Sequence, residues 1–315
     1  MQSPTEIRKQ ITDQIVAALE QNLVPWRQPW RSNPNSGRPA NVSSRRAYGG
    51  VNPLLLMLHA EKYEFQSRWW GTFNQWQALG GILRKRAAQV EPGQWGAQIV
   101  FDKLINRTVV DADTGEEKDR RFPLLRTFTV FNADQVVGKS VETFQTPKLT
   151  DDENVTPNFA PADELIAATG ADIRPSQDKA YYLRPVPEDS WPHHKDGDLI
   201  VMPRRQSFTK PGAYYETIFH ELAHWAEVRV GWDHREHGYS AGELVAEMTG
   251  TFLASELGVP DGEDLTNHAA YLKSWLDVMK ADPSFIFRAS TQASKVSDYL
   301  LSFVRESANS VSEAA

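Results

Sequence analysis

The stretch YYETIFHELAHW, residues 214–225, places His220 and His224 four positions apart, with Glu221 between them. In an α-helix, residues four apart lie on the same face, so both imidazoles can bind one metal ion from a rigid support. Glu221, next to the first histidine, can then take a proton from water at the remaining coordination position. Apolar residues on the other faces allow the helix to be buried. The pattern predicts a helix over residues 211–229 that carries a hydrolytic zinc site.

The spacing of the residues that follow narrows the class of metal site. A metzincin would need glycine at position 227 and histidine at position 230, but the sequence has Glu227 and Val230. Two alternatives remain open: histidines that only hydrogen-bond to neighbours, and a metal that is purely structural. The open coordination position beside Glu221 argues against a structural metal.

A catalytic zinc usually has three protein ligands, so the third must come from elsewhere in the chain. The segment GELVAEMTGTFLASEL predicts a second helix, and it places Glu243 19 residues after His224. We predict Glu243 as the third ligand. Glu247, one turn later on the same face, is predicted to accept the free ring N–H of a ligating histidine. The two glutamates can exchange roles, and His234 or His237 are alternative ligands from a polar loop.

Three side chains are candidates to stabilise an oxyanion, namely Tyr239, Tyr215 and His237, and the sequence does not choose among them. We predict Zn²⁺ as the ion, although histidine and carboxylate ligands also accept Mn²⁺ or Co²⁺. The residues from 214 to 254 resemble the gluzincin metallopeptidases. This resemblance implies a zinc metallopeptidase activity.

The first third of the chain has a different composition from the rest. Residues 1–110 hold 14 lysines and arginines against 7 aspartates and glutamates, whereas the whole chain has a net charge of −7. Six of the ten tryptophans also lie there, so we expect an anionic partner for this part. The chain has no cysteine, no apolar run long enough to cross a membrane and no secretory signal. These features favour a cytoplasmic protein without disulfides.

Periodicity and turn signals predict an α+β fold with two domains. A small α+β domain is expected at residues 1–137 and a polar linker at 138–160. A mainly helical domain is expected at 161–305 and a disordered tail at 306–315. The first domain is predicted to have helices near residues 5–23, 52–63 and 72–81, with Thr5 as the first cap, and strands near 97–104 and 124–138.

Cationic and aromatic residues alternate in the first domain, in PWRQPWR, SRRAYGGVN, SRWWGTFNQW and LRKR. Proteins that hold single-stranded nucleic acid without reading its sequence combine these two residue types. A tryptophan taken singly is more commonly a core residue, and we assign Trp70 and Trp76 to the core. The collective pattern predicts single-stranded DNA binding, with contacts from Trp26, Arg27, Trp30, Arg31, Arg45, Arg46, Tyr48, Asn52, Arg68, Trp69, Phe73, Gln75 and Lys85.

Both halves together resemble the ArdC antirestriction proteins, through VPWRQPW, RRAYGGVN, RWWGTFNQWQALGG, FTVFNADQV, MPRRQSF, YYETIFHELAHW and GELVAEMTGTFL. The resemblance implies a plasmid or phage origin, a bacterial cytoplasmic location with transfer into recipient cells, and protection of incoming DNA against restriction. It also implies a protein substrate or a host restriction component as a partner. The sequence departs from the family at Arg86, where a glycine-centred turn is expected.

Two other functions remain as alternatives. One is a DNA-binding protective protein whose metal site is structural or catalytically dispensable. The other, a nuclease or primase accessory protein, is disfavoured because the sequence lacks an acidic cluster suited to paired magnesium ions and a complete polymerase motif.

Overall fold

The protein is represented by a computed structural model that describes residues 3–21, 23–26, 35–110, 117–146, 159–185, 197–260 and 266–313. Within these ranges only the backbone is described for residues 102–107, 109–110, 118–124, 266–270 and 306–313. None of the described helices is long and apolar enough to cross a membrane.

The first helix, α1 (Pro4–Glu20), begins with a capping box. The Ser3 hydroxyl accepts a hydrogen bond from the Glu6 backbone N–H at 3.2 Å, and the Glu6 carboxylate accepts one from the Ser3 N–H at 2.7 Å. The cap is therefore Ser3 and not the predicted Thr5, because the box satisfies two backbone donors that Thr5 would leave open. One face of the helix is buried through Ile7, Ile11, Ile15 and Leu19.

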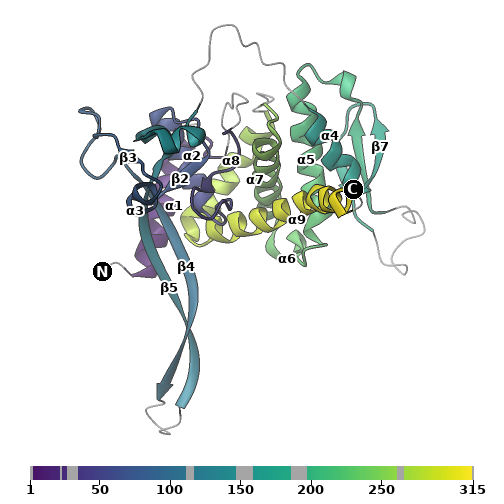
Figure 1. Cartoon of the computed structure of the whole chain (residues 1–315). Coiled ribbons are helices and arrows are strands. Elements are labelled where there is room, and N and C mark those ends of the chain that lie inside the picture. Colours follow the sequence, from purple (N-terminus) through teal and green to yellow (C-terminus); the bar gives the residue numbers. More distant parts are fainter. Residues whose placement is uncertain are drawn as a thin grey trace.

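The first domain is built on a four-stranded sheet of order β1-β2-β5-β4. The strands β1 and β2 are parallel, and the other neighbours are antiparallel. The predicted strand near 97–104 and the first part of that near 124–138 belong to a longer hairpin of β4 and β5, which projects from the body of the molecule (Figure 1). The second predicted strand ends early, because β5 stops at Asn132 and residues 133–135 form a 3₁₀ helix. The element bounds are β1 (Ala40–Asn41), α2 (Asn52–Tyr63), β2 (Trp69–Gly71), α3 (Phe73–Ala78), β4 (Ala97–Val110) and β5 (Glu117–Asn132).

A second, two-stranded sheet extends the first domain beyond its predicted end. It pairs β3 (Ile82–Leu83) with β6 (Val136–Val137), and the 3₁₀ helices η1 (Ala133–Gln135) and η2 (Lys139–Phe144) flank β6. Val141 and Phe144 of η2 are buried in one cluster with Trp76. Residues 138–146 therefore pack on the first domain, although the predicted linker begins at 138.

The second domain combines a small sheet with long helices. Its sheet has the order β7-β9-β8, with β7 parallel and β8 antiparallel to the central strand. The helix α9 continues through residue 313, which differs from the predicted disordered tail. The bounds are α4 (Ala160–Thr169), β7 (Asp172–Ser176), β8 (Tyr181–Leu183), β9 (Leu199–Pro203), η3 (Arg205–Ser207), α5 (Pro211–Glu227), α6 (His234–His237), α7 (Tyr239–Leu257), α8 (Thr266–Ala281) and α9 (Phe285–Glu313).

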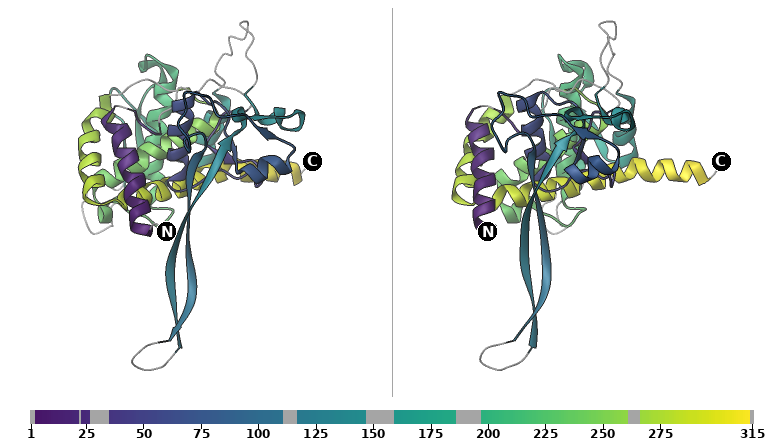
Figure 2. Two further views of the ribbon diagram at one scale, coloured as in Figure 1. Left: turned by 90° about the vertical axis from the view of Figure 1, so that its left-hand side faces the viewer. Right: turned by 60° about the vertical axis from the view of Figure 1, so that its left-hand side comes forward.

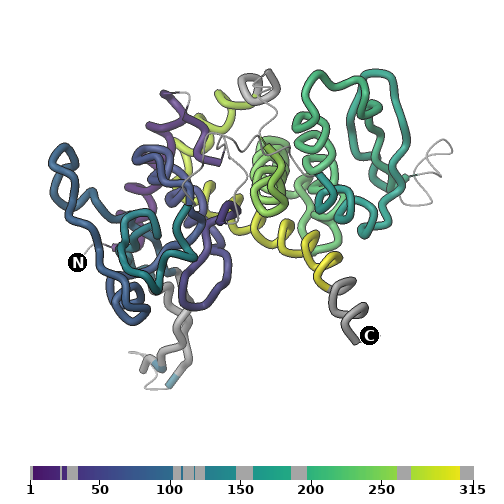
Figure 3. The backbone as a smooth tube through the Cα atoms, turned by 45° about the horizontal axis from the view of Figure 1, so that its top comes forward, coloured from purple at the N-terminus to yellow at the C-terminus, as the bar shows by residue number. Residues whose placement is uncertain are grey.

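The two domains share one hydrophobic core. A single buried cluster includes residues of α1 and α2 together with residues of α5, α7, α8 and α9. The tube in Figure 3 shows α9 running from the first-domain side to the second. The domains are thus distinct along the chain but continuous in packing.

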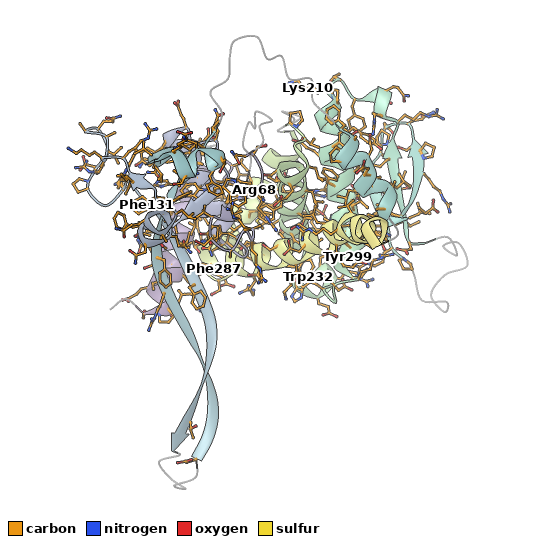
Figure 4. The ribbon with its side chains drawn as sticks, viewed as in Figure 1. Arg68, Phe131, Lys210, Trp232, Phe287 and Tyr299 are labelled. Atoms are coloured by element: carbon orange, nitrogen blue, oxygen red, sulfur yellow. The ribbon has the colours of Figure 1, made fainter. Side chains whose placement is uncertain are left out.

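Two first-domain arginines fix α7 in place. The Arg68 guanidinium donates two hydrogen bonds to the Glu256 carboxylate, at 2.8 and 3.0 Å. Arg38, whose side chain is 3% exposed, lies 3.6 Å from Glu256 and 2.5 Å from Asp298 of α9. Figure 4 places Arg68 between the first-domain elements and α7. Glu256 thus connects the first domain to the helix that also holds Glu243.

Trp26 is part of the shared core and not a DNA contact. Its side chain is fully buried, and its ring meets that of Trp275 on α8 edge-on, with 5.9 Å between centroids. The predicted stacking role is wrong for this residue, because a base cannot reach a ring that is sealed between two domains.

We expect Trp26→Ala to lower the free energy of unfolding by about 3–5 kcal/mol, because the substitution opens a cavity in the core. Chemical denaturation measures this change. Phe73→Ala, at a side chain that is 52% exposed, is the control and is expected to change stability by less than about 0.5 kcal/mol. Equal stabilities for the two variants would contradict the core assignment.

Candidate metal centre and nucleic-acid surface

The helices α5 and α7 supply the predicted metal ligands. The Nε2 atoms of His220 and His224 lie 3.2 Å apart. The Glu243 carboxylate lies 3.5 Å from Nε2 of His220 through one oxygen, and 3.6 Å from Nε2 of His224 through the other. The three side chains therefore form a triangle of donor atoms, within 4.8 Å of one another.

The shape of this triangle fits a divalent cation. Zinc bonds to nitrogen and oxygen of about 2.0–2.1 Å set tetrahedral ligands about 3.3–3.4 Å apart. The separation of the two histidine nitrogens, and the distance from each of them to its nearer Glu243 oxygen, lie close to that range. The donors are two imidazoles and one carboxylate, the set found in one class of catalytic zinc sites. The residues present thus fit the ion that the sequence predicts.

Each histidine has a carboxylate on its other ring nitrogen. Glu247 lies 3.7 Å from Nδ1 of His220, and its predicted hydrogen bond to this ring stays a prediction. Glu227 lies 3.6 Å from Nδ1 of His224 and is only 1% exposed. Carboxylates in these positions orient a ligating imidazole and fix its tautomer. Glu227 was missed as a partner, although its place three residues after His224 puts it one turn along the same helix face.

Glu227 also belongs to a second group of possible metal donors, with His224 and His234. Burial raises the pKa of Glu227, but the neighbouring imidazoles of His224 and His234 outweigh burial and leave that pKa below its usual value. Arg184 donates a hydrogen bond to the same carboxylate at 2.8 Å. A guanidinium at that distance opposes a cation, so the group of His220, His224 and Glu243 is the better site.

Gly242 allows α6 to approach this network. A Cβ atom at Gly242 would lie 2.6 Å from the Cβ atom of His234, which is too close for any other residue without a shift. The imidazole of His234 can therefore hydrogen-bond to Glu227 while α6 packs on α7.

Glu221 faces the metal site from a buried position. It lines a cavity of about 750 Å³ together with the three metal-site residues. Burial raises its pKa, while the charges of His220 and His224 act in the opposite direction. A carboxylate with a raised pKa is a stronger base than an exposed glutamate, which suits proton transfer near neutral pH.

Of the three oxyanion candidates, only Tyr239 lines the cavity. Its hydroxyl lies 2.8 Å from that of Tyr271, a cavity residue that the sequence did not single out. Tyr215 is fully buried and donates a hydrogen bond to Asp163 at 2.8 Å. His237 stacks on Trp232 at a centroid distance of 5.1 Å. The structure places Tyr215 and His237 away from the cavity, which contradicts the predicted oxyanion role for both.

We expect Glu227→Gln and Glu247→Gln each to weaken divalent-metal affinity by about 10- to 100-fold, as loss of such a partner typically does. Competition with a chromophoric chelator measures the affinity. Glu236→Gln, an exposed position on α6, is the control and is expected to leave the affinity unchanged. If Glu227→Gln and Glu247→Gln both keep the wild-type metal affinity, these carboxylates do not orient the two histidines.

The first domain holds a cationic and aromatic surface around Arg45. This exposed guanidinium lies 4.2 Å from the ring centroid of Phe144 and 5.2 Å from that of Trp69. Arg45 has a φ of 60°, a left-handed conformation that is unusual for arginine. The Trp69 indole N–H donates a hydrogen bond to Asn35 at 2.9 Å. The loop thus holds a cation over aromatic rings, and this Arg45–Trp69 surface brings together two of the predicted DNA contacts.

Other predicted DNA contacts have structural roles. Asn52 exchanges two hydrogen bonds with the backbone of Val100, at 2.7 and 2.9 Å, and so covers the edge of β4. Gln75 completes the capping box of α3. The Tyr48 hydroxyl accepts a hydrogen bond from Asn41 at 3.0 Å. These bonds, and the Glu256 pair of Arg68, give a structural role to four half-buried residues, namely Asn52, Gln75, Tyr48 and Arg68. Their DNA contacts stay predictions.

The remaining predicted contacts fall into two groups. The side chains of Arg46, Phe73 and Lys85 are exposed, so their predicted roles stay open. Arg27, Trp30 and Arg31 lie outside the described residues.

Comparison with known protein families matches each domain separately. Residues 5–131 match the N-terminal domain of anti-restriction factor ArdC, and residues 160–292 match a zincin-like metallopeptidase family. An uncharacterized protein of Sinorhizobium fredii named y4eC is 33% identical over 310 residues, covering 95% of this chain and 92% of that protein. A DNA primase TraC of Escherichia coli is 30% identical over 311 residues, which are 94% of this chain but 27% of the primase.

Two crystal structures of the antirestriction protein ArdC from plasmid R388 have the same fold. The metal-free structure is 34% identical with a TM-score of 0.72, covering 95% of this chain and 98% of that one. The Mn(II)-bound structure is 32% identical with a TM-score of 0.65, covering 94% and 97%. The zincin-like match and the metal-bound relative imply a divalent-metal site. Because the likeness spans both domains and nearly the full length of these relatives, the chain belongs to the ArdC antirestriction family.

Proposed function

We propose that this protein is a plasmid- or phage-encoded antirestriction protein that binds single-stranded DNA non-specifically and protects incoming DNA from host restriction. We further propose a zinc-dependent peptidase centre in the second domain, acting on a protein substrate or a host restriction component. The observation that carries the proposal is the His220, His224 and Glu243 triangle beside Glu221, in a chain whose other domain is of the ArdC type. Its place of action would be the bacterial cytoplasm, including that of a recipient cell.

The residues of the cavity divide the proposed reaction between them. His220, His224 and Glu243 would hold Zn²⁺, or Mn²⁺ or Co²⁺ with the same ligands, and Glu247 would orient His220. The ion would polarise a peptide carbonyl and lower the pKa of water. Glu221 would accept the water proton and pass it to the leaving amine. The Tyr239 hydroxyl lines the same cavity and would donate a hydrogen bond to the developing negative charge.

The Arg45–Trp69 surface supports the DNA-binding half of the proposal. A guanidinium held over aromatic rings offers both a phosphate contact and a stacking face. Single-strand binding of this kind releases counterions, so affinity falls as salt rises.

We expect Arg45→Gln to weaken oligonucleotide binding and to reduce the slope of log affinity against log salt by about 0.7, the share of one phosphate contact. Fluorescence anisotropy across a salt series measures both quantities. Arg174→Gln, at an exposed ion pair with Asp172 in the second domain, is the matched control. A salt slope identical to that of the control would argue against a phosphate contact at Arg45.

A second candidate function is a DNA-binding shield whose metal site is structural or catalytically dispensable. It is favoured by Glu256, which ties α7 to Arg68 and Arg38 of the first domain. The same helix holds Glu243, so a metal ion there could serve mainly to hold the two domains together.

Entry of unmodified plasmid into a restricting host separates the two candidates. Wild-type protein is expected to raise the number of transformants, and Arg45→Gln to raise it less. Loss of protection in Glu221→Gln would support the peptidase. Full protection by Glu221→Gln would support the shield, and absence of protection by the wild type would refute the antirestriction function.

A further inference from the structure

Two phenylalanines of the projecting hairpin are exposed to solvent, outside the sites described above. Phe101 of β4 is 48% exposed and Phe128 of β5 is 43% exposed. Their ring centroids lie 6.3 Å apart, with the planes at 89°. A pair of large aromatic side chains held together on a surface marks a contact site more often than a single exposed one does.

The pairing register places an arginine on the same face. Phe101 pairs with Arg126, and Ile99 pairs with Phe128. Directly paired residues of an antiparallel ladder share one face of the ribbon, and so do residues two apart on one strand. Phe101, Arg126 and Phe128 therefore lie on one face, which we call the ribbon face. Arg126 is exposed.

The distribution of charge along the hairpin follows the same register. The ribbon face continues outward through backbone positions 103, 107, 118 and 120, all of which are lysine or arginine in the sequence. The acidic residues of the two strands, Asp102, Glu117 and Asp119, fall at positions of the opposite face. Within residues 97–110 and 117–132, the ribbon face thus has cationic and aromatic positions and no acidic one.

We propose that the ribbon face binds single-stranded nucleic acid, with bases stacked on Phe101 and Phe128 and a phosphate paired with Arg126. This inference rests on the DNA-binding function proposed above and assigns it a second surface, separate from that of Arg45 and Trp69. Charge complementarity favours a polyanion as the ligand, because the ribbon face has cationic positions and no acidic one. The perpendicular rings suit a single strand, whose bases can turn independently, better than a duplex with parallel base pairs.

The position of the hairpin is compatible with this role. The two views of Figure 2 show β4 and β5 extending away from the helices of the second domain. At its base the hairpin is anchored, since Val100 and Leu125 on the opposite face are buried in the shared core. A strand bound along the ribbon face would therefore be held on a fixed support and away from the metal cavity.

Fluorescence anisotropy with a labelled oligothymidine, recorded over a salt series on the full chain, tests the ribbon face. The double variant Phe101→Ala/Phe128→Ala is expected to weaken binding at least roughly tenfold without changing the salt slope, because stacking is lost but no charge. The double variant Phe101→Tyr/Phe128→Tyr keeps both aromatic rings and is expected to bind with the affinity of the wild type. Arg126→Gln is expected to lower the slope by about 0.7. Ile82→Ala, at another exposed apolar side chain (69% exposed), is the matched control and should bind as the wild type does.

The outcomes separate this inference from the function on which it rests. One outcome overturns the ribbon face alone: the wild type binds the oligonucleotide, Arg45→Gln weakens this binding, and the double alanine variant stays within twofold of the wild type. Absence of wild-type binding at low salt overturns both. Unchanged oligonucleotide affinity with loss of protection in cells would assign the face to a protein partner and also overturn the inference. Because the substituted side chains are exposed, matching thermal unfolding curves are expected for all variants.

Discussion

Glu221→Gln is expected to reduce metal-dependent peptide hydrolysis by at least about 100-fold, the contribution of a general base. Glutamine keeps the size and shape of the side chain but cannot take the proton. The three donors of the metal site are His220, His224 and Glu243, so affinity for the ion is expected to stay as in the wild type. A fluorogenic peptide library measures hydrolysis, and isothermal titration measures metal binding.

Glu216→Gln, on α5 and lining the same cavity one turn before His220, is the control for removing a nearby carboxylate. It is expected to retain most of the hydrolytic activity. Wild-type turnover in Glu221→Gln would refute the base assignment. Loss of metal affinity in that variant would instead make Glu221 a ligand.

His224→Ala is expected to weaken divalent-metal binding by more than about 10- to 100-fold. The smaller loss is typical for a carboxylate that only orients a ligand, as proposed for Glu227 and Glu247. The substitution removes one of three donors and leaves the carboxylates of Glu227 and Glu243 without their shared imidazole. Metal at about 100 times its dissociation constant stabilises the wild type by about 2.7 kcal/mol. This gain in stability is expected to disappear in the variant.

Thermal unfolding with and without added metal measures this effect. His237→Ala is the matched histidine control, because His237 is exposed and stacks on Trp232 outside the cavity. The control should show the full metal-dependent rise in melting temperature. If added metal raises the melting temperature of His224→Ala as much as that of the wild type, the ion binds elsewhere.

Local sequence signals are enough to predict the two helices and the close approach of His220, His224 and Glu243, whereas metal binding by these residues stays a prediction. The four-residue spacing of His220 and His224 fixes their common face wherever a helix forms, so the pair requires no knowledge of the tertiary fold. Glu243 was harder to predict because it depends on how α7 folds back onto α5. The 19-residue separation and the helical pattern around Glu243 were enough to predict the juxtaposition that the structure shows.

Contacts between the domains were not predictable from local patterns. Trp26 and Arg68 stand in aromatic and basic stretches that are typical of a nucleic-acid surface, yet they contact Trp275 and Glu256, about 250 and 190 residues away. Composition identifies such residues as available for stacking or pairing, but only the fold determines the partner. The same limit explains why Tyr215 was proposed for the cavity although it is buried against Asp163.

The hairpin differs from these cases, because its sequence alone predicts two strands but does not assign their cations and phenylalanines to a face. The alternation becomes informative only once the register pairs Phe101 with Arg126, because a shift of one residue would exchange the two faces.

A crystal structure of the metal-loaded protein would show whether one divalent ion binds between α5 and α7. We predict one anomalous-scattering peak within about 2.0–2.2 Å of Nε2 of His220, Nε2 of His224 and a carboxylate oxygen of Glu243, with Glu221 outside bonding distance. A peak bound instead by His224, Glu227 and His234, the second group of donors in the described residues, would refute the assignment of His220 and Glu243 as ligands.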